Sequence, residues 1–229
     1  MFPIKDDNPT VRPPVLTVAL IVINVVVYLY EFALGAGVER FVLKYGAVPY
    51  ELTHITETTP GLASPILLTL FTSMFLHGGW LHVGSNMLFL WVFGNNIEDK
   101  LGHVRFLIFY VFSGVVAVLT FVVTSPNAQI PLVGASGAVS GILGAYVMAF
   151  PRARVLTVIW VFFFIRLIWL PAVYFLGFWF ILQVLYGLPT LGGSGSGVAY
   201  FAHIGGFVFG MLYCRLSRLW RVRREGHYA

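Results

Sequence analysis

Charge is scarce in this chain of 229 residues, and acidic side chains are missing from most of its second half. Only 10% of the residues are charged and 59% are hydrophobic, whereas soluble domains are about a quarter charged and about half apolar. This composition excludes an ordinary soluble domain and indicates a polytopic membrane protein. Between Lys100 and Arg224 there is no Asp or Glu. Catalysis that needs a carboxylate from that stretch is therefore excluded.

Several common ligand sites are also missing. The single cysteine, Cys214, cannot form an internal disulfide and does not define a metal site. No His-Glu pair occurs, so the His-Glu-x-x-His motif of metalloproteases is absent. The glycine-serine run at 192–197 lacks the ending of a phosphate loop and is predicted to be a flexible linker. We expect no cofactor and no metal, with a three-histidine site of His77, His82 and His203 as a rival interpretation.

Apolar runs dominate what is present, and six of them are predicted to cross the membrane as helices. The first run is longer than the apolar core of a signal peptide, which favours an uncleaved span over that alternative. The apolar piece at 65–76 is too short to cross, so we expect a first external loop, residues 35–79, that dips into the membrane. The predicted spans are 15–34, 80–94 with a possible extension to 97, 106–123, 136–150, 167–186 and 198–216.

Two segments outside the spans carry expectations of their own. Residues 1–14 contain four prolines and are predicted to be a disordered cytoplasmic lead. A charge at mid-membrane is costly, so Arg166 places residues 155–165 at the cytoplasmic interface rather than inside the bilayer. The predicted organisation is a lead at 1–14, a six-span domain at 15–216 and a basic cytoplasmic tail at 217–229.

Basic residues predict the orientation. The loops after spans three and five contain no Lys or Arg, so the positive-inside rule puts both termini in the cytoplasm and the start of span four at the outer face. The basic tail is expected to contact anionic lipid headgroups and not nucleic acid. The basic residues on the predicted inner side are Lys100, Arg105, Arg152, Arg154, Arg215, Arg218, Arg221, Arg223 and Arg224.

Four polar side chains are predicted to share one depth near the outer face. Ser136 opens span four, while His82 and Asn86, four residues apart, lie on one face of the opening turns of span two. His203 lies in the opening turns of the last span, which also enters from outside. A single intramembrane histidine is as easily explained by a helix-helix hydrogen bond, but four such residues at one depth indicate a functional site.

The chemistry of these residues predicts a serine nucleophile with a histidine base. We assign His203 as the base because Gly206 and Gly210 allow the last span to approach the glycine-rich span four closely. His82 and Asn86, with the Ser136 backbone N–H at a helix start, suit stabilisation of an oxyanion. Because no acid is available for a third member, a Ser/His dyad is predicted.

These residues resemble the rhomboid intramembrane serine proteases. The resemblance covers about residues 70–212 and rests on Gly134-Ala135-Ser136-Gly137, on His203 in Ala-His-x-x-Gly-x-x-x-Gly, and on His82 with Asn86 in His-x-x-x-Asn. It implies an all-α membrane protein, a six-transmembrane-helix bundle with a membrane-embedded first external loop. It also implies a Ser136/His203 dyad in a water-filled cavity open to the outside, with His82 and Asn86 at the oxyanion. The implied substrates are transmembrane helices of other proteins, cleaved near their outer ends.

The chain departs from the family pattern at two places. A Trp-Arg pair often seen in the first loop is missing, and Ser140 stands where some members carry a tyrosine that packs on the base. His203 is therefore expected to be held differently or more loosely. An inactive relative that binds and routes membrane proteins is the alternative function. A bacterial or archaeal cell membrane is the expected location, with an organelle membrane as the alternative. No oligomeric state is predicted. The nucleophile elbow of soluble hydrolases is disfavoured because Ala138 replaces its second glycine.

Overall fold

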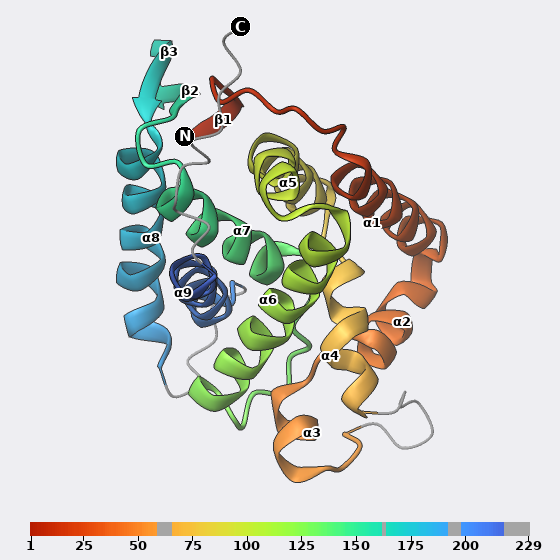
Figure 1. Ribbon diagram of the computed structural model, residues 1–229. Coiled ribbons are helices and arrows are strands. Elements are labelled where there is room, and N and C mark those ends of the chain that lie inside the picture. Colours follow the sequence, from red (N-terminus) through yellow and green to blue (C-terminus); the bar gives the residue numbers. More distant parts are fainter. Residues whose placement is uncertain (59–65, 162–163, 192–197, 218–229) are drawn as a thin grey trace, which may run out of the picture.

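The computed structural model describes residues 1–58, 66–161, 164–191 and 198–217. In this part of the chain the molecule is a bundle of helices with a small sheet at one end (Figure 1). Three predictions fall on other residues and so lie outside the described ones: the linker at 192–197, the start of the dipping segment at 65, and the basic tail from 218.

Six helices correspond to the six predicted spans. By length and composition, three described helices could each cross a membrane, namely α1, α6 and α8 with the turn η4 that extends it. A fourth crossing results if a bent pair of helices counts as one span. The six-span count itself stays a prediction. The helices are α1 (Val15–Ala33), α5 (Trp80–Leu101), α6 (His103–Thr124), α7 (Ser136–Ala149), α8 (Ala172–Gly187) and α9 (Tyr200–Leu216), and η4 is Leu188–Thr190.

The boundary between α5 and α6 differs from the prediction. Helix α5 continues to Leu101 instead of ending between Gly94 and Ile97. It ends where Gly102 adopts φ 76°, a left-handed conformation that favours glycine. The polar patch that was expected to separate two spans is therefore helical, and it carries Glu98 into the protein interior, where it is fully buried.

Short helices occupy the first loop, and the dip of its last segment into the membrane stays a prediction. The segment at 66–75 meets α5 at a bend of 81°, at the expected break before Trp80. Ala47 and Leu132 exchange backbone hydrogen bonds of 3.1 and 2.8 Å, and Thr72 Oγ1 donates to the Tyr45 carbonyl at 2.6 Å. These contacts hold the loop without the Trp-Arg pair. Its elements are η1 (Gly35–Gly37), α2 (Val38–Tyr45), α3 (Pro49–His54), η2 (Ile66–Leu68), α4 (Thr69–Thr72) and η3 (Ser73–Phe75).

A three-stranded antiparallel sheet corrects the prediction for residues 1–14. Strands β1 (Phe2–Asp6), β2 (Arg154–Val161) and β3 (Phe164–Pro171) pair in the order β1-β2-β3. The expected disorder of residues 1–14 is wrong, because Phe2 lies opposite Val158 and the N-terminal strand is hydrogen-bonded. The segment at 155–165 contains most of β2 and the start of β3, and its place at the cytoplasmic interface stays a prediction.

The hairpin of β2 and β3 also explains the long apolar run before α8. The first part of the run forms strands β2 and β3, so α8 begins at Ala172 and not at Leu167. Arg166 lies on the exposed strand β3, where its charge needs no burial. The fold is thus a helical membrane bundle to which the sheet adds a small β element.

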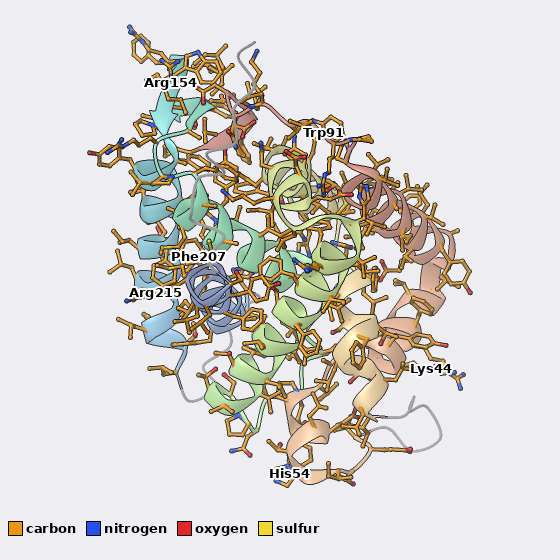
Figure 2. The ribbon with its side chains drawn as sticks, in the orientation of Figure 1. Lys44, His54, Trp91, Arg154, Phe207 and Arg215 are labelled. Carbon is orange, nitrogen blue, oxygen red and sulfur yellow. The ribbon has the colours of Figure 1, made fainter. Side chains whose placement is uncertain are left out.

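The N-terminal segment is tied to the same end of the bundle. Arg154 Nε donates to Asp7 Oδ2 at 2.8 Å, and the Arg12 backbone N–H donates to Asp99 at 2.9 Å. Figure 2 shows Arg154 at this end of the molecule and His54, in the first loop, at the other. The predicted inner and outer faces therefore correspond to two opposite ends of the bundle.

Helix α9 lies among α6, α7 and α8 (Figure 1). Glycines make its contact with α7 very close: a Cβ at Gly206 would lie 2.2 Å from the Gly137 carbonyl oxygen, and one at Gly210 would lie 1.9 Å from that of Gly141. On the other side Phe207, labelled in Figure 2, stacks on Phe180 of α8 at 4.6 Å between ring centroids. The predicted close approach of α7 and α9 is confirmed.

Candidate active site

Ser136 and His203 lie side by side where α7 and α9 begin. Ser136 is the first residue of α7, and His203 lies in the first turn of α9. The distance between Ser136 Oγ and His203 Nε2 is 2.8 Å, which is a normal hydrogen bond. The close glycine contacts between α7 and α9 make this distance possible, because side chains at those positions would hold the two backbones apart.

The other nitrogen of His203 has a partner that the sequence analysis missed. His203 Nδ1 lies 2.8 Å from Gln183 Oε1, and Gln183 Nε2 donates in turn to the Trp179 carbonyl at 3.3 Å. Gln183 is on α8 and only 8% of it is exposed. Its signal in the sequence is that it is the only amide or charged side chain within α8.

Trp179 lies beside the histidine ring, at 6.0 Å between centroids and an interplanar angle of 36°. Ser140, in the place of the family's tyrosine, makes a different contact: its Oγ donates to the Ser136 carbonyl at 2.6 Å. Apart from the contact with Ser136 itself, the side chains that contact the His203 ring therefore come from α8.

His82 faces the same point from α5. Its Nδ1 accepts a hydrogen bond from the Gly78 backbone N–H at 3.2 Å, so in the neutral ring Nε2 carries the proton. A Cβ at Gly134 would lie 2.7 Å from His82 Nε2 and 3.6 Å from Ser136 Oγ. Gly134 has φ 124°, so glycine is needed there for both space and backbone conformation. His82 thus presents an N–H donor next to the serine.

Asn86, one turn further along α5, adds a second donor. Its Nδ2 is buried and has no hydrogen-bond partner among the described residues. A buried amide without a partner is costly in a folded protein. The Ser136 backbone N–H, at the first position of α7, belongs to the amides that lack an acceptor within their own helix. Three N–H groups are therefore available around the serine.

One cavity joins these groups. Its volume is about 920 Å³, which is ample for an extended stretch of peptide. Residues from α5, α7, α8 and α9 border it together with the loop before α7. The four predicted site residues all line it. Among its lining residues are His82, Asn86, Ser136, Ser140, Trp179 and His203.

Glu31 and His77 lie near His82 and contact each other. The Glu31 carboxylate accepts the His77 backbone N–H at 3.1 Å, at the break before α5. The His77 and His82 rings lie 5.1 Å apart between centroids in an edge arrangement. Among the described residues no three His, Cys, Asp or Glu side chains are grouped so that they could hold a metal ion. The three-histidine alternative therefore has no support.

Comparison with known proteins finds one family. The Rhomboid domain matches residues 65–219. The chain is 31% identical over 157 residues to Rhomboid protein 1, mitochondrial, of Saccharomyces cerevisiae, covering 64% of this chain and 40% of that protein. It is 29% identical over 169 residues to the human Presenilin-associated rhomboid-like protein, mitochondrial, covering 71% and 40%. YdcA of Bacillus subtilis, named as a candidate rhomboid protease, is 35% identical over 92 residues, 40% of this chain and 46% of YdcA. The matches thus span less than half of each relative.

Proposed function

Because the chain belongs to the rhomboid family, we propose that it is an intramembrane serine endopeptidase that cleaves transmembrane segments near their extracytoplasmic ends. Ser136 is the nucleophile and His203 the general base. The observation that carries the proposal is the 2.8 Å contact between Ser136 Oγ and His203 Nε2 at the edge of a peptide-sized cavity. A serine next to a neutral imidazole nitrogen is the pairing that activates a hydroxyl for acyl transfer.

The proposed reaction has two halves. Ser136 Oγ bonds to the carbonyl carbon of the scissile peptide while its proton passes to His203 Nε2, and the negative charge collects on the carbonyl oxygen. His203 then protonates the leaving nitrogen, the C–N bond breaks and an acyl-enzyme remains. Water attacks the acyl carbon as His203 takes one of its protons, and the same proton returns to Ser136 Oγ as the new carboxylic acid leaves.

The donors around the serine serve the oxyanion. His82 Nε2–H, the Asn86 amide and the Ser136 backbone N–H converge from two helices on the cavity. Donors that are fixed before reaction stabilise developing charge without a reorganisation cost. The unpartnered Nδ2 of Asn86 supports this role, since an oxyanion would be its missing acceptor.

The substrate must unwind locally, because carbonyls inside an α-helix are hydrogen-bonded to their own chain. We therefore expect cleavage of single-span proteins at small or helix-breaking residues near the outer face. A cleavage map that lies mid-helix in stable leucine-rich segments would contradict this. Membrane lipids are the other expected partner.

The proposed orientation puts both termini in the cytoplasm of a bacterial or archaeal cell and the active site toward the outside. The basic loop at 152–154 supports this, since it lies at the opposite end of the molecule from the first loop (Figure 2). A reporter inserted near residue 194 is expected to be extracytoplasmic. A cytoplasmic signal would separate His203 from Ser136 in the predicted topology and contradict the dyad.

The deciding experiment is cleavage of a model single-span substrate by the purified protein in liposomes. We expect the wild type to cleave with EDTA present, and both Ser136→Ala and His203→Ala to lose activity by at least about 10³-fold. Cleavage by Ser136→Ala would overturn the proposal. A folded wild type that binds the substrate helix without cleaving it would support the alternative function, an inactive relative that binds and routes membrane proteins.

A further inference from the structure

We infer that Gln183 is a positioning residue that fixes the tautomer and orientation of His203, so that the unit is a Ser-His-Gln relay and not an isolated dyad. The inference rests on the proposed function and adds a member to its machinery. Gln183 does not touch the serine, and it acts through the imidazole alone. Its contact with His203 Nδ1 is 2.8 Å, the same length as the contact on the serine side of the ring.

The orientation of the Gln183 amide determines which nitrogen of His203 carries the proton. Gln183 Nε2 is used as a donor to the Trp179 carbonyl, one helical turn earlier on α8, so Oε1 is the atom that faces His203. An amide oxygen can only accept, and Nδ1 must therefore carry the proton. In a neutral ring this leaves Nε2 unprotonated, which is the form that can accept the proton of Ser136. The reversed amide would put a donor at Nδ1 and protonate Nε2, which would block the base.

An amide suits this site better than a carboxylate would. The stretch from 101 to 223 contains no acid, and Gln183 is buried against an apolar helix, where an ionised side chain would carry a large desolvation cost. A neutral acceptor fixes the ring without bringing a charge into the membrane. Trp179 flanks the ring at 6.0 Å, so two residues of α8, one turn apart, hold the base.

Two substitutions separate positioning from packing. Gln183→Met keeps the length of the side chain and removes the acceptor, and we expect kcat to fall about 10- to 100-fold with KM little changed, as for other residues that orient a catalytic group. Gln183→Glu keeps the acceptor and adds a charge, which is expected to move the acid limb of the pH–rate profile upward by about one unit or more. The titratable group across the cavity from His203 is His82 of α5. Ser136, Trp179 and Gln183 face the ring from α7 and α8 and do not titrate in that range.

The matched control is Leu176→Met, a buried position on the same helix that does not line the cavity. Exchanges of similar volume are well tolerated in cores, so this variant is expected to keep wild-type kcat and pH profile. Gln183→Met with the kinetics and pH profile of Leu176→Met would overturn the inference.

A readout that does not need activity keeps the inference separate from the proposed function. With ¹⁵N-labelled histidine, the nitrogen shifts of His203 are expected to report the Nδ1–H tautomer in the wild type and in Ser136→Ala. The His203 signals are assigned by their loss in His203→Asn. In Gln183→Met the tautomer preference is expected to be lost. A wild-type ring protonated at Nε2 would overturn the relay even if the enzyme cleaves, whereas an inactive wild type with the Nδ1–H tautomer would leave the relay intact and refute the proteolytic function.

Discussion

At the scale of single residues, the site is built almost entirely from neutral groups. Ser136, His203, Gln183, His82 and Asn86 come from four helices, and each is oriented by hydrogen bonds or burial and not by an ion pair. In a low-dielectric environment a neutral hydrogen bond is stronger than in water, while an unpaired charge is very costly. Such a site can be assembled within a bilayer without a carboxylate.

Two asparagines on α5 test which polar groups serve chemistry. Asn86 has an unpartnered Nδ2 at the cavity, whereas Asn96 Nδ2 donates to the Asn8 carbonyl at 2.9 Å. We expect Asn86→Ala to lower kcat about 10²- to 10³-fold, as for loss of an oxyanion donor, without lowering the melting temperature.

Asn96→Ala is the control. It is expected to lower stability and not activity, because it loses a hydrogen bond far from the serine. Its cost in unfolding free energy is expected to be about 1 kcal/mol with activity kept. Liposome cleavage assays and thermal unfolding in detergent measure both effects. Equal loss of stability and activity in the two variants would argue against an oxyanion role for Asn86.

The sequence was sufficient to identify the site residues that share one predicted depth in the membrane. Ser136, His82, Asn86 and His203 stood out because polar side chains at helix starts are rare in apolar runs, and all four line one cavity. Gln183 stands out as the only amide or charged side chain within α8, but its position in the sequence does not indicate a contact with His203. Its role depends on how α8 is rotated against α9, which is a property of packing and not of periodicity.

At the scale of elements, the contact between α7 and α9 sets the distance of the proposed dyad. A Cβ at Gly210 would lie 1.9 Å from the Gly141 carbonyl oxygen, whereas a Cβ at Gly177 of α8 would meet nothing within 4 Å. We expect Gly210→Ala to force the helices apart and to lower the unfolding free energy by about 1–3 kcal/mol, with a matching loss of cleavage.

Gly177→Ala is the control for Gly210→Ala, because it makes the same glycine-to-alanine change where no atom lies within 4 Å of the new Cβ. It is expected to leave stability unchanged or slightly raised, because alanine has the higher helix propensity and the space is open. Thermal unfolding of both variants measures the difference. Similar melting temperatures for the two would show that the close helix contact has little energetic weight.

The helices were predictable because their signal is local. Apolar runs predicted α1 and α7 within one or two residues, and Gly78-Gly79 marked the break before α5. The strands were missed for two reasons: the partner of Phe2 is the distant Val158, and β2 and β3 lie in a stretch that is apolar apart from Arg154, Thr157 and Arg166. A continuous apolar run does not distinguish a strand from a helix.

At the scale of the whole molecule, the N-terminal segment and the sheet clamp one end of the bundle. Hydrogen bonds from the Arg154 backbone N–H and guanidinium hold the pKa of Asp7 below its ordinary value of 3.8. A carboxylate with a lowered folded-state pKa adds stability above its unfolded pKa, and this is lost as pH falls through the folded value. The clamp is therefore expected to weaken in acid below about pH 4.

The comparison of wild type with Asp7→Asn isolates this contribution. Burial raises the pKa of neighbouring Asp6, which accepts a hydrogen bond from the Tyr146 hydroxyl, so Asp6 acts with the opposite sign. The charge of Asp7 adds a smaller part to this rise, and Asp7→Asn removes that part alone. Hydrogen exchange of the β1 amides is expected to be slower in the wild type at pH 6 and equal in the two proteins at strongly acidic pH. A difference that persists unchanged in acid would contradict the assignment to Asp7.

The register of the sheet has a consequence for how the protein is made. Strand β1 pairs with residues 149 to 156 positions later in the chain, so at about 5–20 residues per second a ribosome needs roughly 8–30 s to supply its partner. During that time β1 is synthesised but has no strand to bind, while helices α1 to α7 emerge. Closing this end of the molecule is then a late event of biogenesis, and it requires the N-terminus to stay on the side of the membrane where the 154–171 hairpin emerges.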